Sequence, residues 1–137
     1  MRVILDTNVL VSALIRRDGP PGEILEYWFE DRFTLLTHKL LLEELRAVTR
    51  RDHIRALVRP SEAGRLVNQI RAASQLVTKL PAVRRSADPA DDFLLALCEA
   101  GGADYLVSGD KSGLLDLGRH EATSILTARD FCDMLRR

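Results

Sequence analysis

Acidic residues stand at four separated points of the 137-residue sequence where the surrounding pattern predicts buried or half-buried structure. They are Asp6, Glu44, Asp92 and Asp110. Carboxylates that folding gathers away from bulk water repel one another and lose hydration unless protons or metal ions neutralise them. Oxygen ligands of this kind suit Mg²⁺ or Mn²⁺, and a divalent ion held by acids supports phosphodiester chemistry.

Two of these acids, Asp6 and Asp110, come at the ends of apolar runs. Asp6 follows the β-branched run 2–5, and Asp110 closes the run 106–109. Each acid also has an ordinary structural explanation when it is taken alone. Asp6 could cap a following helix, and aspartate is common in turns such as the one expected at Asp110.

Glu44 lies within an apolar stripe instead of on a polar helix face. Leu41, Glu44, Leu45 and Val48 follow the spacing i, i+3, i+4, i+7 that marks the inward side of a helix. The neighbouring Glu43 has the solvent-facing phase. We therefore expect Glu44 either to be buried and paired or to border a polar cavity.

The segment from Asp88 to Asp92 holds three acids with different expected roles. Asp88 is well placed as a helix N-cap before Pro89, and Asp91 at the third helical position can satisfy the N-cap amide. Asp92 has no such structural reason, and it begins a nearly all-apolar helix. The pattern therefore favours Asp92 over Asp91 as the functional acid.

Strands that alternate with helices must position these acids. Strands are predicted at 2–5, 33–37, 75–80, 105–108 and 124–126, and helices at 8–15, 20–31, 38–50, 61–74, 88–100 and from 127 onward. This order predicts a single three-layer α/β/α domain over residues 1–137 with a mainly parallel central sheet. Ligand sites in such sheets lie beyond the carboxyl ends of the strands, where Asp6 and Asp110 are expected.

Composition is that of an ordered globular protein, with 46% hydrophobic and 29% charged residues. The longest apolar stretches, such as 93–98, are too short to span a bilayer, and the N-terminal residues lack a secretory h-region, so we expect a cytoplasmic protein with no membrane contact. The formal net charge is zero. With the four acids set aside, however, 20 basic residues face 16 acidic ones, which leaves positive surface for phosphates.

Cysteine and histidine residues do not indicate a further site. Cys98 and Cys132 form no CxxC pair, and we expect both to be small buried hydrophobic residues. His38, His53 and His120 have no metal-ligand spacing to one another or to the cysteines, so no zinc site is predicted.

The acidic segments, in this order and context, resemble the PIN-domain family of metal-dependent nucleases, and specifically the bacterial group related to VapC toxins. The resemblance is carried by residues 4–10, 41–45, 88–96 and 103–111, and it covers most of the chain. It implies that Asp6, Glu44, Asp92 and Asp110 bind the metal and form the catalytic quartet.

The resemblance also implies supporting roles for other residues. Asn8 would orient Asp6 or a metal-bound water, and Ser108 stands where the family often has threonine, which keeps the hydroxyl. Many relatives carry a further acid after the equivalent of Asp110, and Asp116 is the nearest candidate here. The basic residues that follow the motif segments are candidates for phosphate contacts: Arg16, Arg17 and Lys111.

The expected function is that of an Mg²⁺- or Mn²⁺-dependent endoribonuclease, in which a metal-activated water cleaves RNA phosphodiester bonds. The resemblance further implies the toxin component of a type II toxin–antitoxin pair, a homodimer and a cognate antitoxin protein. The helix that carries Tyr27, Trp28 and Phe29 could supply a partner surface, although aromatic residues at this spacing are more often part of a core.

Two alternatives belong to other functional classes. The first is a non-catalytic PIN-fold module that binds nucleic acid or protein. The second is a phosphatase of the haloacid dehalogenase type, which also begins with an aspartate after its first strand. That chemistry requires a second aspartate two residues later, and the residue there is Asn8.

Overall fold

The computed structural model of the protein describes residues 1–109 and 113–137. Its strands form a six-stranded sheet in the order β3-β2-β1-β4-β6-β5. All neighbouring strands are parallel except β5, which is antiparallel to β6. The strands are β1 (Arg2–Leu5), β2 (Thr34–Thr37), β3 (Gln75–Leu76), β4 (Tyr105–Val107), β5 (Arg119–His120) and β6 (Thr123–Leu126).

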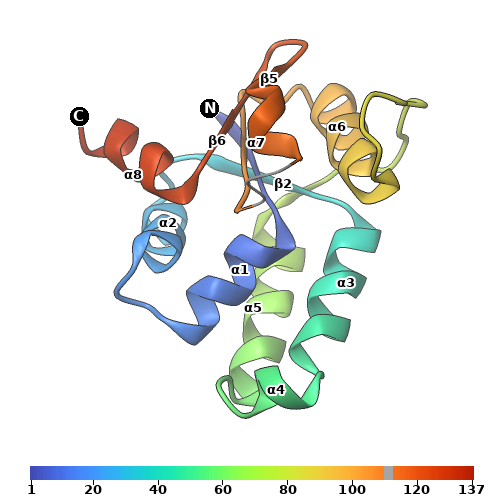
Figure 1. Ribbon diagram of the computed structural model, residues 1–137. Coiled ribbons are helices and arrows are strands. Elements are labelled where there is room, and N and C mark those ends of the chain that lie inside the picture. The colour runs from blue at the N-terminus through green and yellow to red at the C-terminus, as the bar shows by residue number, and fades with distance from the viewer. Residues whose placement is uncertain (110–112) are drawn as a thin grey trace.

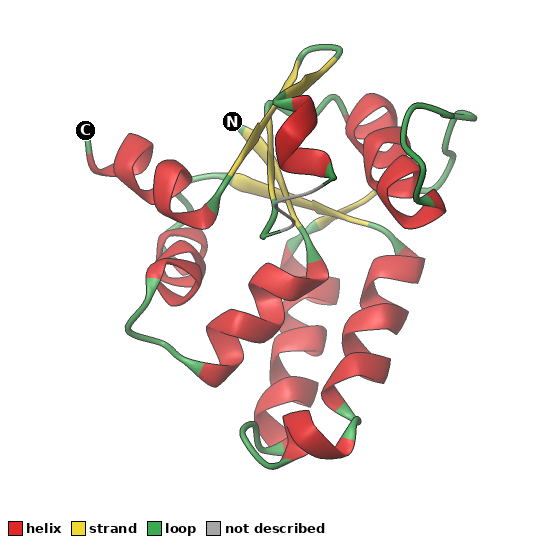
Figure 2. Ribbon diagram, in the orientation of Figure 1, coloured by secondary structure: helices red, strands yellow, loops and turns green. Residues whose placement is uncertain are grey.

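Helices connect the strands and pack around the sheet (Figure 2). The longer ones are α1 (Thr7–Ile15), α2 (Pro20–Phe29), α3 (Lys39–Thr49), α5 (Pro60–Ala73), α6 (Pro89–Gly101) and α8 (Ala128–Arg136). Two helices, α4 (Asp52–Arg55) and α7 (Leu114–Leu117), are single turns. No helix in the described ranges combines the length and apolar character that a bilayer crossing requires.

Two hydrophobic cores lie on opposite faces of the sheet, as the alternation of β1 shows. Val3 and Leu5 belong to one core, which α1, α2, α5 and α8 cover, whereas Ile4 belongs to the other core beneath α6. Figure 1 shows α6 apart from α1, α2 and α5, with the strands between them. The predicted three-layer α/β/α architecture is therefore confirmed.

Local sequence signals explain where the helices begin. The Asp88 carboxylate accepts a hydrogen bond from the Ala90 amide at 2.9 Å, and Pro89 occupies the first turn, as predicted. The Thr127 hydroxyl accepts from the Asp130 amide at 3.1 Å, as expected of its capping position. Both caps fix the residue at which a helix begins.

The sequence predictions and the structure differ in short elements. The predicted strand 75–80 is shortened to β3, an edge strand whose two residues are exposed. The helices α4 and α7 and the strand β5 were not predicted, because elements of two to four residues are too short to show periodicity. In α2, Trp28 is part of the core, whereas Phe29 is 42% exposed.

Candidate active site

The carboxyl ends of β1 and β4 meet where the order of strands reverses. The chain passes from β1 to β2 and β3 on one side, and β4 then pairs with the opposite edge of β1. Open parallel sheets bind their ligands at such a switch point. Asp6 and Ser108 follow these two strands directly, and this position makes them candidates for a site.

Asp6 is held in place by β4 and the residue that follows it. Its amide donates to the Val107 carbonyl at 3.0 Å, and the buried Ser108 hydroxyl donates to Asp6 Oδ2 at 3.0 Å. Asp6 occupies the N-cap position of α1, but its side chain makes no capping hydrogen bond. The amides of Thr7 and Asn8 at the start of α1 lower the pKa of its carboxyl only as the smallest of several effects, so helix capping is not its main interaction.

A cleft of about 440 Å³ lies at the N-terminal ends of α1, α3 and α6. Its lining residues are Asp6, Asn8, Leu40, Glu44, Asp88, Ala90, Asp91, Phe93 and Leu94. Because Asp88 caps α6, three acids remain without a capping role: Asp6, Glu44 and Asp91. They come from three separated segments of the sequence.

Electrostatics at Asp6 disfavour its charge. Burial raises the pKa of the Asp6 carboxyl, and the negative charge of Glu44 raises it further, whereas the hydrogen bond from Ser108 and the amides of Thr7 and Asn8 oppose both effects. A nearby cation would reverse this balance by stabilising the ionised form. The cleft is therefore suited to a positive ligand.

Glu44 borders the cleft and is not buried in the core. The buried positions of α3 are Leu41, Leu42, Leu45 and Thr49, and Glu44 lies beside this stripe with its side chain exposed. Of the two outcomes expected from the helical spacing, the structure shows the second, a carboxylate at the border of a polar cavity.

The structure reverses the choice between Asp91 and Asp92. Asp91 is 8% exposed and lines the cleft with Asp6 and Glu44, whereas Asp92 does not line it. Asp91 and Asp92 point about 100° apart on α6, and Asp92 lines a separate hollow with Ser86 and Pro89. The expectation that Asp92 joins the other acids is therefore corrected in favour of Asp91.

Asp92 has a structural contact that the sequence did not reveal. Its Oδ1 atom accepts from the amides of Arg85 at 3.0 Å and Ser86 at 2.7 Å, which fixes the segment that precedes α6. Asp91 was expected to accept from the N-cap amide of Asp88, but that amide donates to the Ser86 hydroxyl at 3.2 Å. No helical periodicity could reveal a hydrogen bond to a preceding loop.

The remaining predicted residues are distributed around the molecule. Asn8 is exposed and lines the cleft, whereas Asp116 is exposed on α7 and is not among the lining residues. Arg16 and Arg17 follow the far end of the nine-residue α1, about 14 Å along its axis from Asp6. Arg16 there pairs with Asp18 at 2.8 Å. Asp110 and Lys111 lie outside the described residues.

A different cluster has the closer spacing typical of metal ligands. In residues 1–109 and 113–137, the group whose ligand atoms all lie within 4.8 Å of one another is Glu99, His120 and Glu121. The spacing of the histidines gave no sign of it, because the fold brings β5 beside α6. His120 Nε2 lies 2.6 Å from Glu99 Oε2, and its Nδ1 lies 2.9 Å from the Arg85 guanidinium. That guanidinium disfavours a cation, and we interpret the group as a structural clamp.

The donor set of the cleft fits a hard divalent ion. Asp6, Glu44 and Asp91 offer only oxygen atoms, which Mg²⁺ and Mn²⁺ prefer. The three do not form a group with all ligand atoms within 4.8 Å. Mg²⁺ usually keeps several water ligands and takes one or two carboxylates, so this wider spacing is compatible with its binding.

Comparison with known proteins agrees with this geometry. A family model described as the PIN domain matches residues 2–112. The chain therefore belongs to the PIN-domain family, which indicates a nuclease, a hydrolase that acts on nucleic acids.

One relative shares a shorter stretch of sequence. An uncharacterised protein of Methanocaldococcus jannaschii is 42% identical over 45 residues, which cover 33% of this chain and 29% of that protein. The match thus spans less than a third of that relative's length, and it identifies no activity.

Proposed function

We propose that this protein is a divalent-metal-dependent endoribonuclease whose active site is the acidic cleft. The main observation in support is that one cleft at the switch point of the sheet is lined by acids from three separated segments, Asp6, Glu44 and Asp91. The family resemblance adds Asp110 as a fourth acid. Asp91 takes the place that the sequence pattern assigned to Asp92.

The side chains of the cleft have distinct roles in this proposal. Ser108 holds the Asp6 carboxylate by donating to Oδ2, and Asn8 offers an amide at the mouth of the cleft. Glu44 and Asp91 complete the oxygen donors for Mg²⁺ or Mn²⁺. When bound, the ion would acidify the attacking water and neutralise the charge that develops on the phosphate.

The finer biological role follows from the resemblance. We propose that this chain is a single PIN domain, a cytoplasmic toxin of the VapC kind that forms a homodimer and is inhibited by a cognate antitoxin. The half-exposed Phe29 beside the buried Trp28 offers one small apolar surface for such contacts.

Cleavage of RNA by the purified protein tests the catalytic proposal. Wild-type protein should cleave members of a panel of structured RNAs with Mn²⁺ or Mg²⁺, and EDTA should stop the reaction. Asp6→Asn should lower the rate by about 100-fold or more, because it removes a ligand charge from the metal site.

Two outcomes would contradict this proposal. Equal cleavage by wild type and Asp6→Asn would indicate a contaminant or another site, and cleavage in EDTA would exclude the metal mechanism. RNA binding without cleavage or metal binding would instead support the non-catalytic module.

A further inference from the structure

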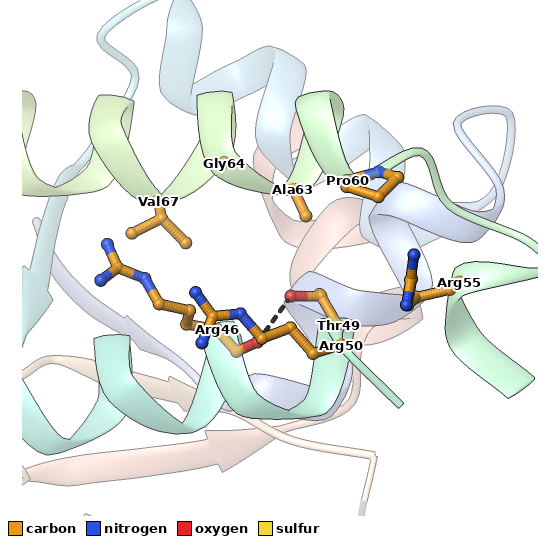
Figure 3. A pocket seen from close by; sticks show the side chains of 8 residues that line it. All are labelled: Arg46, Thr49, Arg50, Arg55, Pro60, Ala63, Gly64 and Val67. Carbon is orange, nitrogen blue, oxygen red and sulfur yellow. Dashed lines mark hydrogen bonds between the residues drawn. The ribbon is translucent and has the colours of Figure 1, made fainter. Parts of the chain in front are cut away.

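A groove rich in arginine lies between α3 and α5, separate from the acidic cleft (Figure 3). It measures about 440 Å³, and its lining residues are Arg46, Thr49, Arg50, Arg55, Pro60, Ala63, Gly64 and Val67. In Figure 3 the side chains of Arg46 and Arg50 extend from α3 into the space before α5. The helix α5 contributes small and apolar residues, so the arginines provide the chemistry of the groove.

The three arginines are not neutralised by neighbouring acids. In the part of the chain that the structure describes, Arg16 and Arg136 pair with carboxylates, whereas Arg46, Arg50 and Arg55 form no salt bridge within 4.0 Å. Three guanidinium groups without a carboxylate partner give the groove a positive charge, which an anion would offset.

A second hollow extends the same groove along the two helices. It measures about 340 Å³, shares Arg46 with the first, and is otherwise lined by Lys39, Leu42, Glu43, Arg71 and Leu76. We refer to the two hollows together as the α3–α5 groove. Its charged lining comprises five basic residues and one acid, so it presents an elongated positive track.

The spacing of the charges suits a polymer more than a small anion. Arg46 and Arg50 are four residues apart on α3, on one face and about 6 Å apart along the axis. The start of the 14-residue α5, which has no side-chain cap, adds the positive end of a helix dipole near Pro60. Several separated positive points match a ligand with regularly repeated negative charges.

The position of α3 relates the groove to the cleft. Leu40 and Glu44 line the cleft, whereas the preceding residues, Lys39 and Glu43, line the groove. Adjacent residues of a helix point about 100° apart, so the two sites occupy neighbouring sides of α3. A ligand that leaves the cleft could cross one helix and continue in the groove.

We propose that the α3–α5 groove binds the phosphate backbone of single-stranded RNA beyond the bond to be cleaved. The proposal rests on the ribonuclease function, because that function makes the ligand of the adjacent cleft a polynucleotide. Guanidinium groups bind phosphate oxygens in pairs of hydrogen bonds. No aromatic residue lines the groove for base stacking, so recognition is independent of sequence.

The test measures RNA binding separately from cleavage. A fluorescent 12-nucleotide oligouridylate is titrated with full-length protein in EDTA at several salt concentrations. The variant that carries Arg46→Gln, Arg50→Gln and Arg55→Gln should bind at least about tenfold more weakly, and the slope of log K against log salt should fall by about 2, because each single-strand phosphate contact contributes about 0.7.

A matched variant controls for net charge. Arg32→Gln, Arg119→Gln and Arg137→Gln remove the same charge from exposed positions outside the groove and the cleft, and they should leave affinity and slope close to wild type. Circular dichroism should show that both variants are folded. Equal weakening by both variants, or an unchanged salt slope in the groove variant, would overturn the proposal.

A poly-glutamate peptide of the same charge distinguishes the class of ligand. Tighter binding of the peptide than of the RNA would overturn the assignment to nucleic acid and indicate an acidic protein partner. Because binding is measured in EDTA, these results stand apart from the ribonuclease proposal. If cleavage depends on divalent ions but the groove substitutions do not change RNA binding, the groove proposal is wrong. The ribonuclease proposal for the acidic cleft would still stand.

Discussion

At the scale of single residues, the environment of Asp6 distinguishes a functional carboxylate from a structural one. The Asp6 side chain does not cap its helix, and it receives a hydrogen bond from Ser108 across the sheet. Burial and the charge of Glu44 both raise the pKa of its carboxyl. An acid placed in this way destabilises the metal-free protein, which is typical of a site selected for binding.

Asp6→Asn should therefore not lower the melting temperature of the metal-free protein at neutral pH. The substitution removes a charge that burial and Glu44 disfavour, and the asparagine oxygen can still accept from Ser108. Thermal unfolding in EDTA, monitored by circular dichroism, provides the measurement. A marked fall in melting temperature would show that Asp6 is a structural carboxylate.

The pH dependence of this effect has a definite sign. Because the pKa of Asp6 is raised in the folded state, its contribution to stability is fully present below the ordinary aspartate pKa of about 3.9 and is lost as pH rises through the folded value. Any stability advantage of metal-free Asp6→Asn over the wild type should therefore shrink as pH falls toward about 4. An advantage that grows on acidification would contradict the assignment.

The sequence could predict some site residues but not others, for physical reasons. Strand ends and helical spacing were sufficient to place Asp6 and Glu44 beside the cleft, because the end of a strand and the border of an apolar stripe are local features of the sequence. The choice between Asp91 and Asp92 depended on whether the loop 85–86 turns back to the helix start, which local patterns do not encode. The approach of His120 to Glu99 likewise depends on the tertiary fold.

At the scale of elements, Gly22 allows the start of α2 to lie close to the connection between α1 and α2. A Cβ atom on Gly22 would lie 2.1 Å from the carbonyl oxygen of Arg17, which is a backbone atom and cannot rotate away. The third residue of α2 must therefore be glycine for the helix to lie this close to the backbone of Arg17. By contrast, a Cβ atom on Gly64 in α5 would meet nothing within 4 Å.

These two glycines give a matched pair of substitutions. Gly22→Ala should lower the free energy of unfolding by on the order of 1–3 kcal/mol, because the backbone must shift to remove the overlap. Gly64→Ala should raise it by about 0.4–1 kcal/mol through its higher helix propensity. Urea unfolding measures both changes. Equal effects of the two substitutions would show that the close approach at Gly22 does not exist.

The elements that sequence patterns predict best are the long ones. The boundaries of α5 and α6 lie within one residue of the expected ranges 61–74 and 88–100, because caps and apolar stripes mark them. The edge strand β3 and the single-turn helices carry too few residues to form a pattern. Their positions depend on packing against the rest of the chain.

At the scale of the whole molecule, the parallel sheet explains how distant acids meet. The reversal of strand order between β1 and β4 opens a switch point, and the helices that follow β1 and β2 begin beside it. Alternating strands and helices predicted this architecture, and PIN-domain membership confirms it. The arginine groove was not predicted, because α3 and α5 meet only in the folded chain.

Metal binding should stabilise the whole molecule through the cleft. Mn²⁺ should raise the melting temperature of the wild type, because a ligand at 100 times its dissociation constant adds about 2.7 kcal/mol to the stability of the folded state. Asp91→Asn should show a much smaller rise. An equal rise in both proteins would place the ion elsewhere, and the group around His120 would then be tested by Glu99→Gln.

The most direct test compares Asp91→Asn with Asp92→Asn in Mn²⁺-dependent RNA cleavage. Asp91 lines the cleft with Asp6 and Glu44, whereas an asparagine at position 92 keeps the oxygen that accepts from the amides of Arg85 and Ser86. We expect Asp91→Asn to lose about 100-fold or more of the activity and Asp92→Asn to keep most of it. Loss of activity in Asp92→Asn with retention in Asp91→Asn would contradict the proposed active site.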